Sequence, residues 1–356
     1  MHKALLLAPL LLSTLALTAQ SGANHATAPH PSAHQIITFD APGAVWTSPA
    51  GINDAGQIAG SYYDGTNDHG FIRSSTGAIV TFDVVGCVGA APEAINAGGE
   101  VSGYCYDASN VSHGFVREPS GSTTIFDPPG SARTEAFAIN NLGQVAGAYL
   151  DSALEYESFV RDQLGNITTF TVPGATATRA LYISADGTVT GYFYAQSQNY
   201  SRVFIRDSGG TFTTFSAPGA GKGSAQGTIP VAINANDEIV GFYLSSSDAY
   251  HGFSRDQSGV ITTLDDPHAY KGPDRYFGTV PDAVNVNGEI TGCVQNPSGT
   301  SGFTVDSSLN YTPFTVPGAV TGHIYAGTCP TGVNDSGTIT GSYQDADLVT
   351  HGFIRF

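Results

Sequence analysis

The run INDAGQIAGSYYDGTNDHGFIR, residues 52–73, decides the fold because the chain repeats it. It returns as INAGGEVSGYCYDASNVSHGFVR at residues 95–117 and as INNLGQVAGAYLD at residues 139–151. A repeat whose copies start 43 to 51 residues apart is typical of a solenoid, a propeller or another array. Further copies begin at Ile183, Ile233, Val284 and Val333.

Each copy contains four short runs rich in Val, Ile, Thr, Tyr and Phe, which predict strands bounded by turns. In the first copy these runs are AGIN, QIAGSYYD, HGFIR and AIVTFD. The first two are joined by NDAG, in which Asn can bond its own backbone and Gly can adopt a positive φ. Four antiparallel strands in about 45 residues form one blade of a β-propeller. The sequence therefore predicts an all-β, seven-bladed β-propeller.

The two ends of the repeat region predict how the ring closes. The region starts with IITF, residues 36–39, which matches the fourth strand of a copy. It ends with HGFIRF, residues 351–356, which matches the third strand. We therefore expect the N-terminal strand to complete the last blade, which removes the exposed edges of an open array. An open solenoid is the alternative architecture.

Three positions recur within the blades. We interpret the glycine of the second strand as a point of crowding between blades near the axis, because glycine inside a strand usually marks close backbone approach. We expect the phenylalanine of the third strand to fill the space between neighbouring blades. The arginine that follows it in six copies predicts a ladder of ion pairs. The glycines are Gly60, Gly103, Gly147, Gly191, Gly241, Gly292 and Gly341; the phenylalanines are Phe71, Phe115, Phe159, Phe204, Phe253, Phe303 and Phe353; the arginines are Arg73, Arg117, Arg161, Arg206, Arg255 and Arg355.

Composition excludes some partners. Hydrophobic residues make up 41% of the 356-residue chain, enough for a core, while charged residues make up 12%, about half the usual share. The formal net charge is −17, and 13 basic residues cannot form the broad cationic surface that nucleic acid requires. We therefore expect no nucleic-acid partner.

The N-terminus predicts export. His2 and Lys3 precede an apolar run, and Ser21, Gly22 and Ala23 fit a cleavage site, so residues 1–23 resemble a signal peptide. The apolar run is short for a membrane span. We expect a flexible leader over residues 24–34 and one propeller domain over residues 35–356. The expected product is a secreted or periplasmic monomer without a membrane span.

Four cysteines in an exported chain predict two disulfides, for which three pairings exist. Cys87 and Cys105 fall in the second copy, whereas Cys293 and Cys329 fall in the sixth and seventh. Because the copies place the two sets far apart, we predict that Cys87 bonds to Cys105 and Cys293 to Cys329.

The motifs HGFIR, HGFVR and INxxGxIxG resemble the bacterial extracellular repeats of the HAF family, whose signature includes a His-small-Phe run. The resemblance covers residues 35–356, with Gly in this chain where that signature has Ala. It implies an exported repeat protein and supplies no catalytic residues.

Loop lengths single out one face. The turns between the first and second strands, and between the third and fourth, keep their length in every copy and share what we call the uniform face. The blade-to-blade connections lie on the opposite, long-loop face. They span 10 residues in the first four copies and 15, 17 and 16 in the fifth to seventh. Variable loops on a rigid scaffold commonly build a binding surface.

The inserted runs are Gly219–Pro230, His268–Pro281 and Gly318–Pro330, and they hold both lysines that remain after signal removal. Aromatic rings beside hydrogen-bonding cations suit sugars, acidic glycans or a peptide carboxylate. Loops with solvated charges are the alternative interpretation. The candidate ligand-binding residues are Lys222, His268, Tyr270, Lys271, Asp274, Arg275, Tyr276, His323 and Tyr325.

The other polar repeats favour structural roles. Histidines open the third strand of four blades and are spread around the ring, so they cannot gather on one metal, and we predict a capping role. Aspartates at the end of the second strand suit turn chemistry, with calcium between loops as the alternative. We expect no metal and no cofactor. The histidines are His69, His113, His251 and His351, and the aspartates are Asp64, Asp107, Asp151 and Asp345.

Two functions follow from these patterns. The first is a secreted binding protein that holds a glycan, an acidic sugar or a peptide on the long-loop face of blades 5–7. The alternative is a polysaccharide-acting enzyme. The chain lacks HExxH, GxSxG and CxxC motifs, but it contains side chains that can act as acids and bases. A lyase would use His323 or a tyrosine as base beside Arg275 or Lys271. A hydrolase would use two carboxylates, for which the inserted runs offer Asp274 and Asp282.

Overall fold

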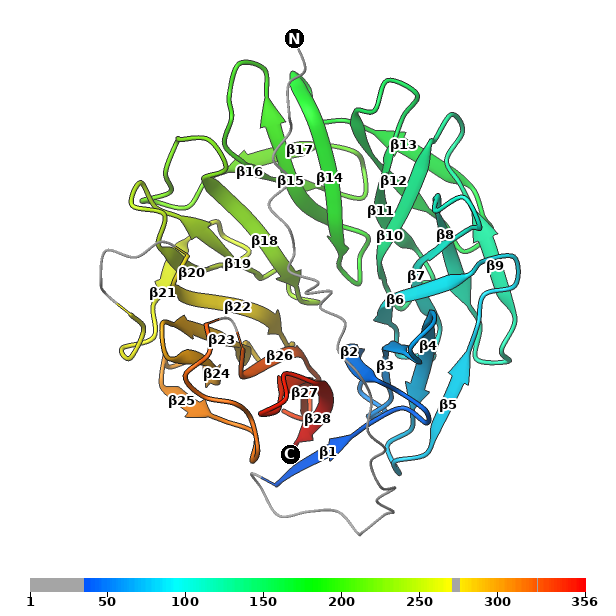
Figure 1. The fold of residues 1–356 in the computed structure, drawn as a ribbon. Coiled ribbons are helices and arrows are strands. Elements are labelled where there is room, and N and C mark those ends of the chain that lie inside the picture. Colours follow the sequence, from blue (N-terminus) through cyan, green and yellow to red (C-terminus); the bar gives the residue numbers. More distant parts are fainter. Residues whose placement is uncertain (1–34, 271–275, 325) are drawn as a thin grey trace.

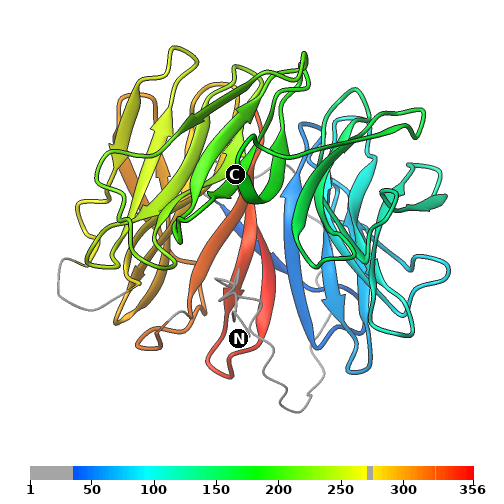
Figure 2. The ribbon, with the colours of Figure 1, turned by 90° about the horizontal axis from the view of Figure 1, so that it is seen from above.

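The computed structural model describes residues 35–270, 276–324 and 326–356. In these residues it contains strands β1 to β28 and no α-helix. Figure 1 shows the strands in radial groups around a central axis, and Figure 2 shows the ring from the side. The first strand of each group lies nearest the centre (Figure 1).

The groups, numbered as blades in chain order, each contain four strands. Blade 1 has β2 (Trp46–Ile52), β3 (Ile58–Tyr63), β4 (Asp68–Arg73) and β5 (Ile79–Phe82); blade 2 has β6 (Gly89–Ile95), β7 (Val101–Tyr106), β8 (Ser112–Arg117) and β9 (Thr123–Phe126); blade 3 has β10 (Arg133–Ile139), β11 (Val145–Leu150), β12 (Tyr156–Arg161) and β13 (Ile167–Phe170). Blade 4 has β14 (Ala175–Ile183), β15 (Val189–Ala195), β16 (Arg202–Arg206) and β17 (Phe212–Phe215); blade 5 has β18 (Gly227–Ile233), β19 (Ile239–Leu244), β20 (Tyr250–Arg255) and β21 (Ile261–Leu264). Blade 6 has β22 (Gly278–Val284), β23 (Ile290–Asn296), β24 (Gly299–Val305) and β25 (Tyr311–Phe314); blade 7 has β26 (Thr328–Val333), β27 (Ile339–Gln344), β28 (Thr350–Arg355) and β1 (Ile36–Phe39).

Within every blade, neighbouring strands pair antiparallel. One parallel bridge between Tyr250 and Gly278 joins blades 5 and 6 into an eight-stranded sheet. The predicted all-β propeller class is confirmed.

The two ends of the chain meet in blade 7. Strand β1 pairs with β28, with Ile36 opposite Arg355 and Phe39 opposite Gly352 (Figure 1). Phe39 also packs edge-to-face on Phe71 of blade 1, with ring centroids 6.0 Å apart. Blades 7 and 1 are thus held together by a strand from the far end of the sequence.

The repeated glycine sits opposite a β-bulge. In blade 1 the first strand bulges between Pro49 and Gly51, and Gly60 pairs with Pro49. A Cβ on Gly60 would lie 2.3 Å from the Ser48 carbonyl oxygen and 2.8 Å from the Phe71 ring. These neighbours belong to the same blade, so the prediction of crowding between blades is wrong. The absence of a side chain at this glycine leaves room for the bulged first strand of the same blade.

The repeated phenylalanines lie between blades, as predicted, and all of them are fully buried. Phe115 packs edge-to-face on Phe82 of the preceding blade, and five of the other repeated phenylalanines make the same contact. Phe303 instead packs in a cluster with Leu264. Within the described part of the chain, the contacts of the repeated arginines do not form the predicted ladder of ion pairs from blade to blade. Their common contact is a cation–π stack on that same phenylalanine, as in Arg117 over Phe82 at 4.8 Å. The other five stack at 4.7 to 5.1 Å.

Both predicted disulfides are present. Cys87 and Cys105 close a loop at blade 2, and Cys293 and Cys329 join blades 6 and 7. Among the described residues, no helix has the length and apolar character to span a membrane.

Candidate functional site

The three long loops are anchored on the preceding blade. In blade 5 the loop ends with Gln226, whose carbonyl accepts from the Ser201 amide of blade 4. The Tyr250 amide donates to Phe277 O before blade 6, and the Thr300 amide donates to Ala326 O before blade 7. Each loop therefore bonds to the start of the third strand of the neighbouring blade before its own blade begins.

Glycine makes this junction possible. Parallel bridges pair Gly227 with Ser201, Gly278 with Tyr250 and Gly327 with Thr300. The glycine φ angles are 112°, 138° and 138°, and an added Cβ would lie 2.2, 1.9 and 2.1 Å from the partner's carbonyl oxygen. Such conformations are open to glycine alone. The ends of the inserted loops are therefore rigid.

The predicted ligand-binding residues are distributed along these loops. Lys222, His268 and His323 are exposed, and Tyr276 is 41% exposed with its ring 6.1 Å from that of Tyr250. Tyr270 is half-buried and packs edge-to-face on Phe277. Lys271, Asp274, Arg275 and Tyr325 lie outside the described residues.

Asp282 does not lie in a loop. It lies in strand β22 at the channel, with Oδ2 3.7 Å from Cys293 Sγ and 3.6 Å from Cys329 Sγ. Burial raises the pKa of Asp282 to about 8. The hydrolase that the sequence suggested, with Asp274 and Asp282 together in the loops, therefore lacks its second loop carboxylate.

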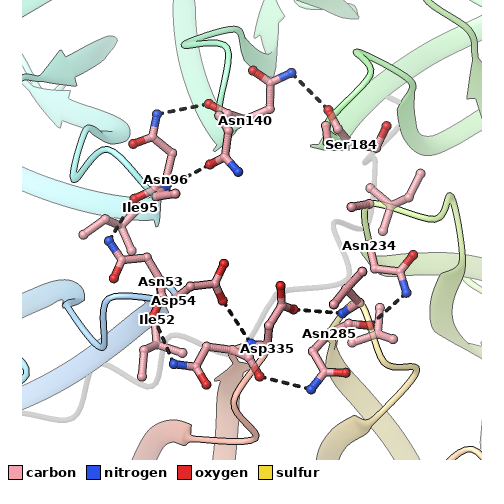
Figure 3. Close-up of a pocket in the computed structure, with 18 of the residues that line it drawn as sticks. Ile52, Asn53, Asp54, Ile95, Asn96, Asn140, Ser184, Asn234, Asn285 and Asp335 are labelled. Carbon is pink, nitrogen blue, oxygen red and sulfur yellow. Dashed lines mark hydrogen bonds between the residues drawn. The ribbon is translucent and has the colours of Figure 1, made fainter.

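A hollow of about 210 Å³ opens at the channel on the uniform face (Figure 3). The residue that directly follows each first strand forms its ring: Asn53 Nδ2 donates to Asn96 O, and Asn334 Nδ2 donates to Asn53 O. The same Asn53 accepts the Gln57 amide through Oδ1, as the sequence predicted for the turn. The amide groups are used to join blades, so we assign this ring to structure. The other members are Asn140, Ser184, Asn234 and Asn285.

A second hollow, of about 410 Å³, lies between blades 1 and 2 and is lined by His69, Asp83 and Val84–Ala90. His69 Nδ1 contacts Asp83 at 2.5 Å, and Nε2 lies 3.2 Å from Asp64. Burial lowers the pKa of His69, but hydrogen bonds that the ring donates to Asp83 and Asp64 outweigh it and raise the pKa overall.

The contact between a histidine and an aspartate recurs at all of the repeated histidines. Each pairs through Nδ1 with the aspartate that follows the fourth strand of its blade, at 2.5 to 3.1 Å. The three blades without this histidine have Thr171, Ser216 or Thr315 in place of the aspartate. The pairs staple the third and fourth strands, which agrees with the predicted capping role. The aspartates are Asp83, Asp127, Asp265 and Asp40.

The channel wall of blades 3 and 4 holds a half-buried charge pair. Arg179 Nη2 in β14 donates to Glu135 Oε2 in β10 at 2.6 Å, and their side chains are 15% and 25% exposed. The guanidinium stacks 4.3 Å over the Tyr156 ring and 5.4 Å over Phe137. Burial would lower the pKa of Arg179, but Tyr192, Glu135 and Tyr156 raise it.

Half-buried aromatic rings surround this pair, and we name them the aromatic cluster. Tyr156 opens β12 and Tyr106 ends β7, so the cluster lies at the channel mouth on the long-loop face. Tyr104 packs on Phe137 of the next blade with centroids 6.4 Å apart. The members are Tyr104, Tyr106, Phe137, Tyr156, Tyr192 and Tyr194.

Glu93 lies beside this cluster in β6. Burial and the neighbouring Glu135 charge raise the pKa of Glu93 to about 8, and a hydrogen bond from Tyr104 partly offsets them. Both effects favour the protonated form of Glu93. Sequence reasoning missed these residues, although one signal was present: Glu135 and Arg179 are 44 residues apart, one repeat, and so occupy one position in consecutive blades.

Comparison with known proteins shows the fold. By sequence, no family model and no curated protein matches the chain. The β-propeller domain of the Trilobed protease from Pyrococcus furiosus is similar in structure, with TM-score 0.56 and 8% identity over 88% of this chain and 94% of that one. A puromycin hydrolase is similar with TM-score 0.55 and 12% identity over 90% of this chain.

The chain spans only part of several of these structures. It covers 62% of TolB from Acinetobacter baumannii, 47% of a prolyl endopeptidase and 54% of the puromycin hydrolase. At such low identities the similarity carries the architecture alone. It places this chain among the β-propellers.

Proposed function

We propose that this protein is a monomeric binding protein that acts outside the cytoplasm and holds a glycan or a peptide on its long-loop face. The observation that carries the proposal is the anchoring of three consecutive loops on one face. Their ends are fixed by parallel bridges, and they expose Lys222, His268 and His323. A rigid base with exposed polar side chains loses little conformational entropy when it binds.

Export is supported by the two disulfides, which persist in oxidising compartments. The signal peptide predicted over residues 1–23 is the means we propose. Mass spectrometry of the mature protein, recovered from outside the cytoplasm, is expected to show cleavage after Ala23.

Binding is tested with an array of oligosaccharides and peptides probed with the whole mature protein. We expect Lys222→Ala, Lys271→Ala, Arg275→Ala and Tyr276→Ala each to weaken binding while the melting temperature stays unchanged. Truncation of a central Tyr or Arg commonly costs about 2 kcal/mol or more. The control is Leu164→Ala, an 82% exposed side chain on the uniform face. Binding that survives all four loop variants would place the ligand elsewhere.

A polysaccharide hydrolase is the second candidate, and one observation favours it. The raised pKa of Glu93 favours its protonated form beside Glu135, whose carboxylate is paired with Arg179. Glycoside hydrolysis uses one protonated and one ionised carboxyl group. Release of reducing ends from polysaccharides that is abolished by Glu93→Gln would establish the enzyme. Binding of a polysaccharide without release of reducing ends would support a binding protein and not an enzyme.

A further inference from the structure

We infer that the aromatic cluster at the channel mouth of blades 2–4 binds an uncharged saccharide, with Glu135 accepting a hydrogen bond from a sugar hydroxyl. The inference rests on the proposed binding function and names its ligand class and its principal contact site. The cluster belongs to the short-loop half of the same face.

Two pairs of tyrosines supply apolar surface for a ligand, and the rings within each pair are perpendicular, at 89°. Tyr104 and Tyr106 alternate along β7, as Tyr192 and Tyr194 do along β15, so each pair lies on one side of its strand. Their centroids are 5.6 and 5.8 Å apart, and all four rings are partly exposed. Tyrosines carried by strands offer a large contact area with little loss of side-chain entropy. The C–H face of a sugar ring matches such a surface.

Glu135 supplies a fixed acceptor beside the rings. Its Oε2 is held by Arg179, whose Nη1 also lies 3.4 Å from the Tyr192 hydroxyl. Among the contacts of the described residues, Oε1 has no hydrogen-bond partner, and the Glu135 side chain is 25% exposed. A carboxylate that is both oriented and accessible suits a hydroxyl donor, because hydrogen bonds to charged acceptors are the stronger ones.

Charge favours a neutral ligand. The Arg179 guanidinium is already paired with Glu135, and the chain as a whole carries a formal charge of −17. That field repels anions such as uronic acids. Partly exposed rings beside one accessible carboxylate oxygen therefore suit an uncharged saccharide.

The test uses an array that carries neutral hexose oligosaccharides, uronic acid oligosaccharides and peptides. We expect the mature protein to bind neutral oligosaccharides, and Glu135→Gln, Tyr106→Ala and Tyr194→Ala each to weaken that binding about tenfold or more. The matched control is Tyr63→Ala, because Tyr63 ends β3 as Tyr106 ends β7 but lies in blade 1, outside the cluster. It should leave binding unchanged. Melting temperatures identify any variant that fails to fold, and Glu135→Gln keeps the shape of the side chain.

The outcomes separate the inference from the proposed function. Neutral-saccharide binding that survives the three cluster variants and is lost in Lys222→Ala overturns the inference and leaves the proposed function standing. Binding of uronic acids or peptides alone also overturns the inference. Absence of binding to every class on the array overturns both.

Discussion

Glu93 makes the stability of this protein depend on pH in a definite direction. Its pKa is about 8 in the folded protein against an ordinary value of 4.5, because it is buried beside the Glu135 charge. Below pH 4.5 both folded and unfolded chains hold the proton, and stability is complete. Between 4.5 and 8 the unfolded chain releases the proton while the folded chain keeps it, so stability falls as pH rises. The full loss is at most about 5 kcal/mol.

Glu93→Gln removes this loss because the amide does not titrate. The variant should match the parent near pH 5 and exceed its unfolding free energy by several kcal/mol near pH 8. The assay is chemical unfolding followed by tryptophan and tyrosine fluorescence at a series of pH values. Asp282, His69 and His351 also have raised pKa values, through burial, through hydrogen bonds with Asp83 and Asp64, and through hydrogen bonding to Asp40. These groups add the same pH dependence to the unfolding free energies of the parent and the variant. The difference between the two unfolding free energies therefore reports on Glu93 alone.

The control is Glu155→Gln, which changes an exposed carboxylate in the turn between β11 and β12. The difference between its unfolding free energy and that of the parent should be the same at every pH. A Glu93→Gln effect of equal size at pH 5 and pH 8 would refute the reasoning, since it would show a packing change rather than a proton held in the folded state.

Three further predictions concern the architecture. Deletion of residues 35–40 removes β1 and the contact of Phe39 with Phe71, so we expect a loss of at least about 3 kcal/mol or aggregation; a variant that melts like the parent would contradict the role of β1. Peptide mapping without reduction should recover Cys87 joined to Cys105 and Cys293 joined to Cys329, and Cys293→Ala with Cys329→Ala should cost about 4 kcal/mol for a 36-residue loop. Gly278→Ala should destabilise by more than about 3 kcal/mol, because its φ is 138° and the new Cβ meets Tyr250 O at 1.9 Å; Gly43→Ala, with φ 79° and open space, is the control and should cost about 1 kcal/mol.

The fold could be predicted because each repeat contains the local sequence signals for its own strands and turns. The Asn–Gly turn, the strand glycine and the buried phenylalanine recur at nearly constant spacing, and each has a physical cause in the structure. What the glycine meets could not be predicted. A glycine inside a strand indicates that another part of the backbone approaches it closely. Which part approaches Gly60 depends on strand pairing, because a bulge between Pro49 and Gly51 turns Ser48 O toward it. The arginines were likewise assigned to ion pairs because their stacking partner lies in the preceding copy.

The aromatic cluster was missed for a related reason. In the sequence, GYCYD and GYFYA look like alternating strand residues whose rings pack in a core. Their place on the long-loop face follows only from the packing of neighbouring blades, as in the contact of Tyr104 with Phe137. Ion pairing of Glu135 with Arg179 could have been anticipated from the repeat length, since opposite charges at one position of consecutive copies become neighbours.

The two halves of the long-loop face differ in how the blades are tied together. Blades 4–7 are joined at this face by the bridges of Gly227, Gly278 and Gly327, which close the seams between their sheets. Blades 2–4 are joined there by side chains, through Arg179, Glu135 and the rings around them. Backbone bridges leave loop side chains free to vary, whereas side chains used as ties are fixed by their partners. A ligand that needs precise hydrogen-bond geometry is therefore better served by blades 2–4, and the long loops are better placed to contact the remainder of an extended glycan.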